Sequence, residues 1–125
     1  MTDGRLNVVV IDDFALIRER LAAMLSEELG ARVVGEAADG VEGLNLIRRT
    51  RPDVAILDLR MPRLDGFGVL TELAAQEQAP QVIVITSYPL AHYQDRCTSL
   101  GAYAVLDKSR DLHKLPDLLR EIAAA

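Results

Sequence analysis

The hydrophobic residues of the chain follow two alternating patterns. The first pattern consists of short runs rich in β-branched residues, and these runs are continuously apolar. Such runs are typical of strands that are covered on both faces in a parallel sheet. They predict five strands, at Leu6–Ile11, Arg32–Glu36, Val54–Leu57, Val82–Ile85 and Ala104–Leu106.

The second pattern lies between these runs, where apolar residues recur at helical spacing and predict five helices. Asp39 and Asp65 each precede a glycine and a helical run, so both are expected to be N-caps. We expect the last helix to be regular only from Pro116, after a loose turn over 109–115, because a proline further inside a helix removes a backbone hydrogen bond. The predicted apolar faces are Phe14, Ile17, Leu21, Met24 and Leu25; Val41, Leu44 and Ile47; Phe67, Leu70, Leu73 and Ala74; Leu90, Tyr93, Cys97 and Leu100; and Leu112, Leu115, Leu119 and Ile122.

The alternation of strands and helices predicts the fold class. Five strands separated by helices favour an α/β architecture, a doubly wound parallel sheet with helices on both faces. A chain of 125 residues has the size of one domain, so we expect a single domain over 1–125. Right-handed crossovers place the carboxyl ends of all the strands at one edge, where open parallel sheets bind ligands.

Composition narrows the functional classes. No apolar run approaches the ~20 residues that span a bilayer, and the single cysteine, Cys97, excludes an internal disulfide framework. Cys97 is expected to be a small core residue. The net charge of −5 and the aromatic fraction of 4% argue against direct binding of nucleic acid. The acidic N-terminal segment does not resemble a secretory signal, so a cytoplasmic location without membrane contact is expected.

Polar side chains end four of the five predicted strands. Asp12 and Asp13 follow the first strand, Asp58 the third, Thr86 closes the fourth, and Lys108 follows the fifth. Carboxylates that meet in one cleft repel one another unless a cation joins them. Hard oxygen ligands in a small, partly solvated site suit Mg²⁺. A hydroxyl and an ammonium beside such a site suit a phosphoryl group, whose equatorial oxygens carry negative charge.

Each of these residues also has an ordinary structural interpretation. An aspartate after a strand often caps the next helix, and Asp13 alone fits that interpretation. Lys108 alone fits a solvated surface lysine, and Thr86 alone fits the end of a strand. The functional interpretation depends on matching chemistry arriving at one edge from four separate strands.

Four segments carry these residues in a characteristic order: Ile11-Asp12-Asp13-Phe14; Leu57-Asp58-Leu59-Arg60-Met61-Pro62 with Leu64-Asp65-Gly66; Val84-Ile85-Thr86-Ser87; and Gly101-Ala102 ahead of Asp107-Lys108. Their order and spacing resemble the receiver domain of bacterial two-component response regulators, of the chemotaxis-regulator type, over essentially the whole chain. The resemblance implies the (βα)5 flavodoxin-like fold with strand order 2-1-3-4-5.

The resemblance also implies a role for each residue. Asp58 would be the phosphoacceptor, Thr86 would hydrogen-bond the acyl phosphate, and Lys108 would pair with it. Phosphorylation would replace one negative charge on Asp58 by roughly two and add three acceptor oxygens. The implied ligands of Mg²⁺ are the carboxylates of Asp12, Asp13 and Asp58 and the backbone carbonyl of Arg60.

The implied partners are a sensor histidine kinase or a phosphotransfer protein as phosphoryl donor, and an unknown downstream protein. The face built from the fourth helix, the fifth strand and the fifth helix would carry the signal, with the chain acting as a monomer or as a phosphorylation-dependent dimer. Leu90, Tyr93 and Tyr103 are candidates on that face. Inward packing of Leu90 and Tyr93 is an equally good interpretation of their helical spacing.

Departures from the family pattern occur on both sides of Lys108. The family usually has an aromatic residue three positions before the lysine, where this chain has Val105, and Tyr103 and Tyr88 are the two candidates to replace it. The family lysine is commonly followed by a proline in a cis peptide, where this chain has Ser109. A non-proline cis bond costs about 2.5–4 kcal/mol, so a trans bond and an altered loop are predicted after Lys108.

Two other functions use similar sheets. An aspartate-nucleophile phosphohydrolase also uses carboxylates, Mg²⁺ and a lysine, but its pattern resembles one with a second aspartate two residues after the nucleophile. Arg60 stands at that position. A flavin-binding electron carrier needs a phosphate loop after the first strand, where Asp12 and Asp13 would repel the phosphate. The sequence therefore favours a signalling switch over an enzyme.

Overall fold

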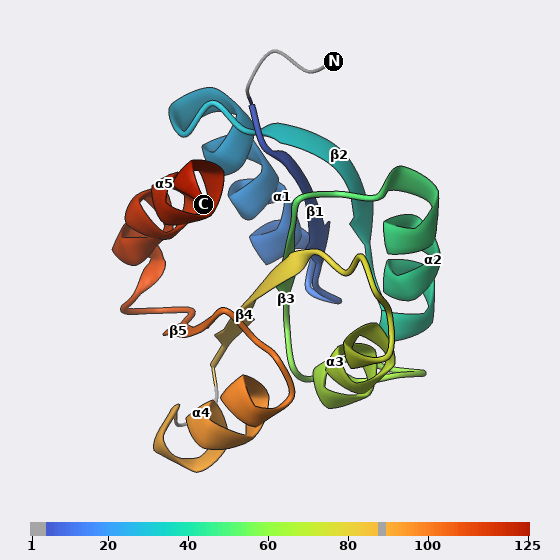
Figure 1. Ribbon diagram of the computed structural model, residues 1–125. Coiled ribbons are helices and arrows are strands. Elements are labelled where there is room, and N and C mark those ends of the chain that lie inside the picture. The colour runs from blue at the N-terminus through green and yellow to red at the C-terminus, as the bar shows by residue number, and fades with distance from the viewer. Residues whose placement is uncertain (1–4, 88–89) are drawn as a thin grey trace.

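The computed structural model describes residues 5–87 and 90–125, the side chain of Leu90 excepted. Its five strands form one parallel sheet in the order β2-β1-β3-β4-β5, which confirms the predicted architecture and strand order (Figure 1). Each strand lies within one or two residues of its predicted range. The strands are β1 (Asn7–Ile11), β2 (Arg32–Ala37), β3 (Val54–Leu57), β4 (Gln81–Thr86) and β5 (Ala104–Asp107).

Helices connect the strands at the predicted places. Two short turns of other helical types flank the regular helices: a π-helical turn over Met24–Glu28 continues the first helix, and a 3₁₀ turn over Leu112–Lys114 precedes the last. The regular helices are α1 (Ala15–Ala23), α2 (Gly40–Thr50), α3 (Gly66–Ala74), α4 (Leu90–Ser99) and α5 (Leu115–Ala124). None of the described helices is long and apolar enough to cross a membrane.

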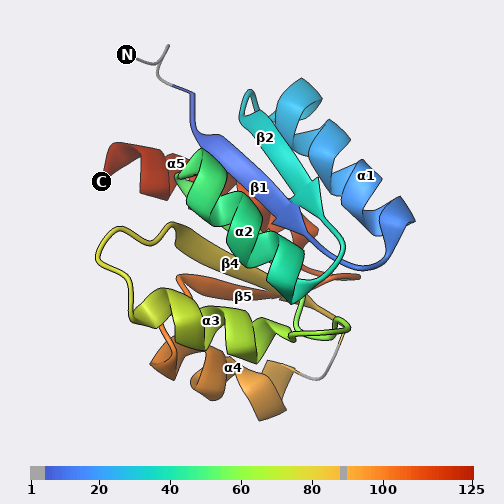
Figure 2. The same cartoon turned by 90° about the vertical axis from the view of Figure 1, so that its right-hand side faces the viewer.

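Helices cover both faces of the sheet (Figure 2). The sheet therefore separates two hydrophobic cores. Val9 and Ile11 of β1 pack with residues of α2, α3 and α4, and Cys97 is buried in this core as predicted. Val8 and Val10 pack on the opposite face with residues of α1 and α5. Because successive side chains of a strand enter different cores, the central strand β3 is apolar throughout, and its neighbours β1 and β4 are apolar in their interiors.

Both predicted N-caps are confirmed. The Asp39 side chain accepts the backbone N–H of Glu42 at 2.8 Å, and the Asp65 side chain accepts that of Gly68 at 2.9 Å. These bonds satisfy N–H groups that have no partner within the first turn of a helix. Asp65, eight residues after the end of β3 at Leu57, thereby fixes the start of α3.

Two residues predicted on apolar helix faces are exposed. Phe14 is 57% exposed because α1 begins only at Ala15, so Phe14 is not part of the helical repeat. Ala74 is exposed and is the last residue of α3. The apolar spacing was therefore correct for the interiors of these helices and wrong at their ends.

The end of the chain fits the expectation for Pro116 with a small shift. The segment predicted as a loose turn contains the 3₁₀ turn, and α5 begins at Leu115 with Pro116 in its first turn. A proline is tolerated there because the N–H it lacks would have no intrahelical partner. The described residues contain no cis peptide bond, so the predicted trans bond between Lys108 and Ser109 is confirmed.

Candidate functional site

The carboxyl ends of β1 and β3 place two aspartates side by side. The ladder of backbone hydrogen bonds continues one residue beyond each strand: the Asp12 N–H donates to the carbonyl of Ala37 at 3.0 Å, and the Asp58 N–H donates to that of Ile11 at 2.9 Å. Both residues are buried, with 1% and 7% exposure respectively. Asp12 and Asp58 are therefore held by the sheet itself and not by a loose loop.

Asp13 completes an acidic cluster. Carboxylate oxygens of Asp12, Asp13 and Asp58 lie within 4.8 Å of one another, with Asp13 exposed at the mouth. Phe14 occupies the cap position of α1, and no side chain caps that helix. The capping alternative for Asp13 is therefore wrong, and its carboxylate belongs to the cluster. Three oxygen donors of this kind are hard ligands suited to a small divalent cation.

Lys108 places its ammonium against two of the three carboxylates. Its Nζ lies 2.8 Å from Oδ2 of Asp12 and 3.5 Å from Oδ2 of Asp58. The Lys108 N–H donates to the carbonyl of Thr86 at 2.9 Å, which fixes the backbone of the lysine beside the end of β4. The sequence-predicted convergence of Asp12, Asp13, Asp58 and Lys108 is thus present in the structure.

The site raises the pKa of Asp58 from 3.8 to about 6. Burial is the largest cause, and the negative charge of Asp12 adds to it, whereas the nearby ammonium of Lys108 lowers the pKa and offsets part of the rise. The negative charge of ionised Asp58 is therefore only partly compensated by the surrounding residues. A perturbed carboxylate in a polar cluster is a typical feature of a functional site.

Asp12 is positioned by contacts that the sequence did not suggest. Its Oδ1 accepts the backbone N–H of Phe14 at 2.9 Å, and its carbonyl accepts Nη1 of Arg18 at 2.7 Å. Arg18 also bonds Glu36 on β2 through Nε at 3.3 Å. Arg18 therefore links α1, Asp12 and the edge strand.

Gly66 is required by the close approach of α3 to the site. A Cβ at this position would lie 2.5 Å from the carbonyl oxygen of Asp58 and 2.8 Å from Cα of Leu59. The Gly66 N–H donates to the Leu59 carbonyl at 2.8 Å, which ties the start of α3 to the residues after Asp58. The absence of a side chain at Gly66 therefore lets the segment around Asp58 pack against α3.

Two further predicted site residues flank the cluster. Thr86 is fully buried at the end of β4, and its Cα is paired with that of Asp107. Arg60 is exposed two residues after Asp58. The hydrogen bond assigned to the Thr86 hydroxyl and the metal contact assigned to the Arg60 carbonyl stay predictions.

The candidates for the signalling face differ in their packing. Val105 is buried in the core under α4, whereas Tyr103 is 39% exposed and its hydroxyl donates to Oε1 of Glu121 on α5 at 2.8 Å. Tyr93 is half-buried against the core, with its ring centroid 5.8 Å from that of Phe67, which supports inward packing. Tyr88 and the side chain of Leu90 lie outside the described residues.

Comparison with known proteins shows the family of this fold and site. The family model described as "Response regulator receiver domain" matches residues 8–120. The transcriptional regulatory protein PdtaR of Mycobacterium tuberculosis is 42% identical over 101 residues, which cover 81% of this chain and 48% of that protein. A protein-glutamate methylesterase/protein-glutamine glutaminase of Anaeromyxobacter dehalogenans is 41% identical over 105 residues, covering 82% of this chain and 29% of that protein.

Solved structures agree with the sequence relatives. The receiver domain of the putative response regulator NarL from Mycobacterium tuberculosis superimposes with a TM-score of 0.88 at 33% identity, covering 97% of this chain and 98% of that one. The receiver domain of AraT from Geobacillus stearothermophilus gives a TM-score of 0.82 at 32% identity, covering 95% and 93%. The chain spans about half the length or less of the two curated relatives named above. The phosphohydrolase alternative receives no support from these matches.

Proposed function

We propose a phosphorylation-dependent switching function for this chain, which belongs to the family of response regulator receiver domains. In this proposal Asp58 accepts a phosphoryl group, and the new charge changes a partner-binding surface of the domain. The observation that carries the proposal is the convergence of Asp12, Asp13 and Asp58 within 4.8 Å, with the ammonium of Lys108 against two of them. The domain acts as a switch and not as an enzyme that turns over a substrate.

The donor set fits Mg²⁺. The ligands would be the carboxylates of Asp12, Asp13 and Asp58 and the backbone carbonyl of Arg60, which are all hard oxygens, and Mg²⁺ commonly keeps waters at a partly exposed site such as the Asp13 side of this cluster. When bound, the ion supplies positive charge that screens the carboxylates from an anionic phosphoryl group. The raised pKa of Asp58 supports this assignment, because it marks a carboxylate whose charge lacks compensation.

Asp58, Lys108 and Thr86 have different roles in the proposed phosphotransfer. An oxygen of ionised Asp58 forms the new P–O bond while the P–N bond of a phosphohistidine donor breaks, and the electron pair of that bond stays on the donor nitrogen. Lys108 needs only a small movement to pair with the phosphoryl group, because its Nζ already lies 3.5 Å from Asp58. The Thr86 hydroxyl would donate to a phosphoryl oxygen, and this would move the segment after β4.

Two exposed apolar side chains beside the site suit the phosphoryl donor. Phe14 and Leu16 are 57% and 60% exposed. Phe14 is the cap residue of α1, and Leu16 is the second residue of that helix. Exposed large apolar residues that neighbour one another often mark protein interfaces. We assign them to contact with a sensor histidine kinase or a phosphotransfer protein, which must bring its phosphohistidine to Asp58.

The output surface is assigned to the face formed by α4, β5 and α5. A groove of about 430 Å³ lies there, and Tyr103, Leu118 and Glu121 contribute to its lining. An unknown downstream protein or a second phosphorylated copy of the chain would bind this face. Phosphorylation shifts the population of the binding-competent conformation, since the two states differ in their contacts with Thr86 and Lys108.

The proposal is tested by incubating the protein with Mg²⁺ and a small-molecule phosphodonor and weighing the intact chain by mass spectrometry. The wild type is expected to gain one phosphoryl group, and Asp58→Ala none. Asp95→Ala removes an exposed carboxylate of α4 and is the matched control that should be modified as the wild type is. Modification of Asp58→Ala to the wild-type extent would contradict the assignment.

A further inference from the structure

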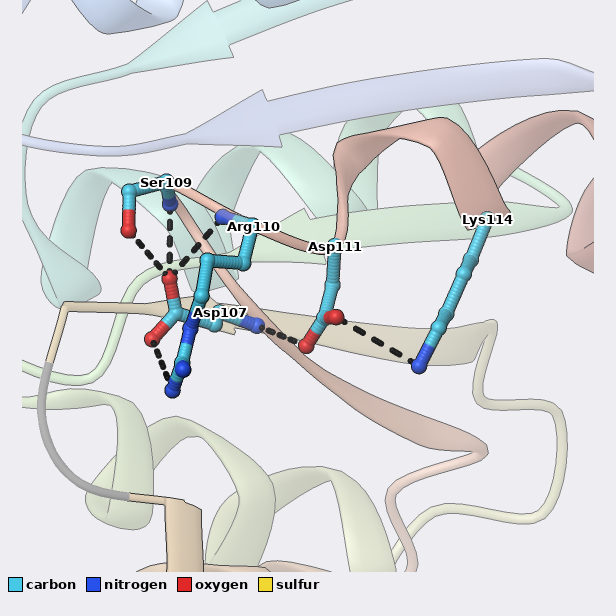
Figure 3. A network of polar contacts seen from close by, with 5 residues as sticks. All are labelled: Asp107, Ser109, Arg110, Asp111 and Lys114. Atoms are coloured by element: carbon cyan, nitrogen blue, oxygen red, sulfur yellow. Dashed lines mark hydrogen bonds and ion pairs between the residues drawn. The ribbon is translucent and has the colours of Figure 1, made fainter.

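A network of hydrogen bonds and ion pairs joins the end of β5 to the loop that follows it, from Asp107 to Lys114 (Figure 3). One oxygen of Asp107, Oδ1, accepts three hydrogen bonds: from the Ser109 N–H at 2.8 Å, from the Ser109 hydroxyl at 2.6 Å, and from the Arg110 N–H at 3.1 Å. Asp107 is the residue immediately before Lys108, and it is buried. Its carboxylate therefore folds the chain back around the lysine.

Asp111, at the other end of the turn, is joined to Asp107 by two hydrogen bonds. Its Oδ2 accepts the Asp107 N–H at 2.9 Å, and its own N–H donates to the Asp107 carbonyl at 3.0 Å. Asp111 is itself paired with Lys114 at 3.4 Å. The Asp107 carboxylate thus accepts N–H groups of the turn, and the Asp111 carboxylate accepts the N–H of Asp107, so side chains satisfy backbone donors at both ends of the turn. Asp111 thereby satisfies an N–H of the edge strand β5 that points away from β4.

The consequence concerns the two peptide groups on either side of the Lys108 Cα. The N–H of the first is bound by the Thr86 carbonyl at 2.9 Å. The N–H of the second, which belongs to Ser109, is bound by the Asp107 carboxylate at 2.8 Å. With both peptide planes fixed, the direction in which the Lys108 side chain leaves the backbone is fixed as well.

We propose that Asp107 is a positioning residue, whose carboxylate holds the peptide after Lys108 and thereby keeps the lysine ammonium between Asp12 and Asp58. This inference rests on the function proposed for Asp58 and Lys108. The hydrogen bonds from Ser109 lower the pKa of Asp107, so the carboxylate stays ionised and accepts strongly at neutral pH. Asp107 does not touch the phosphoryl group, and its effect on phosphotransfer passes through Lys108.

The kinetic test uses the full chain with Mg²⁺ and acetyl phosphate over a range of donor concentrations. Asp107→Ala is expected to slow phosphorylation of Asp58 by about three- to tenfold, because a small displacement of an active-site group costs rate. The loss should fall on the rate at saturating donor and not on the donor concentration that gives half the maximal rate. Asp107→Asn keeps an acceptor oxygen and should retain most of the rate, and Asp117→Ala is a charge-matched control expected to match the wild type.

A double-mutant cycle separates positioning from general damage. In a Lys108→Ala background, Asp107→Ala should have no further effect on the rate. An equal slowing in both backgrounds, or a wild-type rate for Asp107→Ala, would overturn the proposal. Should Asp107→Ala fail to fold, Asp107→Glu serves in its place, because it keeps the charge and displaces the acceptor by one methylene group.

A second readout needs no phosphotransfer. The NMR resonance of the Lys108 ammonium in the unphosphorylated protein reports its surroundings directly, and it should shift in Asp107→Ala but not in Asp107→Asn. An unshifted resonance in Asp107→Ala would overturn the positioning role. Failure of the proposed function would instead appear in the wild type, as absence of phosphoryl on Asp58, while the ammonium resonance still decides the role of Asp107.

Discussion

Lys108 and Asp12 form the tightest ion pair of the site, with 2.8 Å between Nζ and Oδ2, and the same ammonium is 3.5 Å from Asp58. The Asp12 side chain is buried and that of Lys108 is 15% exposed, so solvent screens their attraction less than that of a surface pair. In this state the lysine compensates Asp12 more closely than the proposed phosphoacceptor. The negative charge of ionised Asp58 is therefore only partly neutralised by Lys108, and a bound cation would neutralise more of it.

The first prediction concerns pH and the free energy of unfolding without metal. The pKa of Asp58 is about 6 in the folded protein against an ordinary value of 3.8, so between these values the folded state binds more protons than the unfolded state, and stability falls as pH rises through this window. Asp58→Asn removes this loss. After allowance for partial solvent exposure, the variant should be about 1–2 kcal/mol more stable than wild type near pH 7.

Urea unfolding of both proteins across this pH range provides the measurement. The difference in stability should shrink toward zero near pH 4, where Asp58 is protonated in the folded wild type. A difference that stays constant with pH would show that the asparagine acts through packing and not through removal of the charge.

The second prediction concerns Lys108. Lys108→Met leaves the carboxylates of Asp12 and Asp58 buried without their ammonium, and it should cost about 2–3 kcal/mol of stability in the absence of metal. Saturating Mg²⁺ should restore most of this loss, since a bound divalent cation supplies the missing charge and stabilises the folded state by mass action. Denaturant unfolding with and without Mg²⁺ measures both quantities.

Lys114→Met is the matched control for this experiment. Lys114 pairs with Asp111 at 3.4 Å but is 56% exposed, so its loss should change stability by less than about 1 kcal/mol, independently of Mg²⁺. Equal destabilisation of Lys108→Met with and without the ion would argue against a metal site at the cluster.

The third prediction compares two glycines of α3. Gly66→Ala places a Cβ 2.5 Å from a backbone oxygen of Asp58, and backbone cannot yield cheaply, so a loss of about 2 kcal/mol or more is expected. At Gly68 the added Cβ would crowd the side chain of Leu64, at 2.4 Å, which can rotate away, and it would lie in ordinary contact with Oδ1 of Asp65 at 3.6 Å. Gly68→Ala should therefore change stability by less than about 1 kcal/mol, helped by the better helix propensity of alanine.

Thermal unfolding of the two variants gives the comparison, and phosphorylation by acetyl phosphate adds a functional readout. Gly66→Ala should also slow phosphorylation, because its strain falls on the segment that carries Asp58. Equal behaviour of both variants would mean that the approach of α3 to Asp58 is looser than the structure indicates.

The fourth prediction concerns Phe14 and Leu16, the exposed pair at the start of α1. Phe14→Ser and Leu16→Ser should leave the free energy of unfolding within about 0.5 kcal/mol of wild type, because neither side chain is in a core. Both should slow phosphotransfer from a cognate histidine kinase, while the rate with acetyl phosphate stays unchanged. A wild-type rate with the kinase would show that its contact surface lies elsewhere.

The strand pattern was sufficient to predict the edge at which the site lies. Continuous apolar runs located the strands, and the polar residues directly after them, Asp12, Asp58 and Lys108, were brought together by the sheet. This inference is dependable because parallel strands share one carboxyl edge. The order of the strands came from the family resemblance, since local patterns do not specify which strands are neighbours.

The remaining features depend on where an element begins and on contacts between distant segments. Apolar spacing identified the face of α1 but not its first residue, so Phe14 was placed in the core when it is exposed. The Arg18 contact with the Asp12 carbonyl and the turn around Asp107 require the mutual placement of separate loops. No periodicity in the sequence reports such placements, because each depends on one side chain reaching one backbone group.

Chemical trapping can locate the phosphoryl group that we assign to Asp58. Treating the phosphorylated protein with borohydride reduces an acyl phosphate to an alcohol, so the modified side chain can be located by peptide mass spectrometry. Conversion is expected at Asp58, and it should depend on Mg²⁺ and on the phosphodonor. Conversion at Asp12 or Asp13, or a phosphoryl group on another type of side chain, would contradict this assignment.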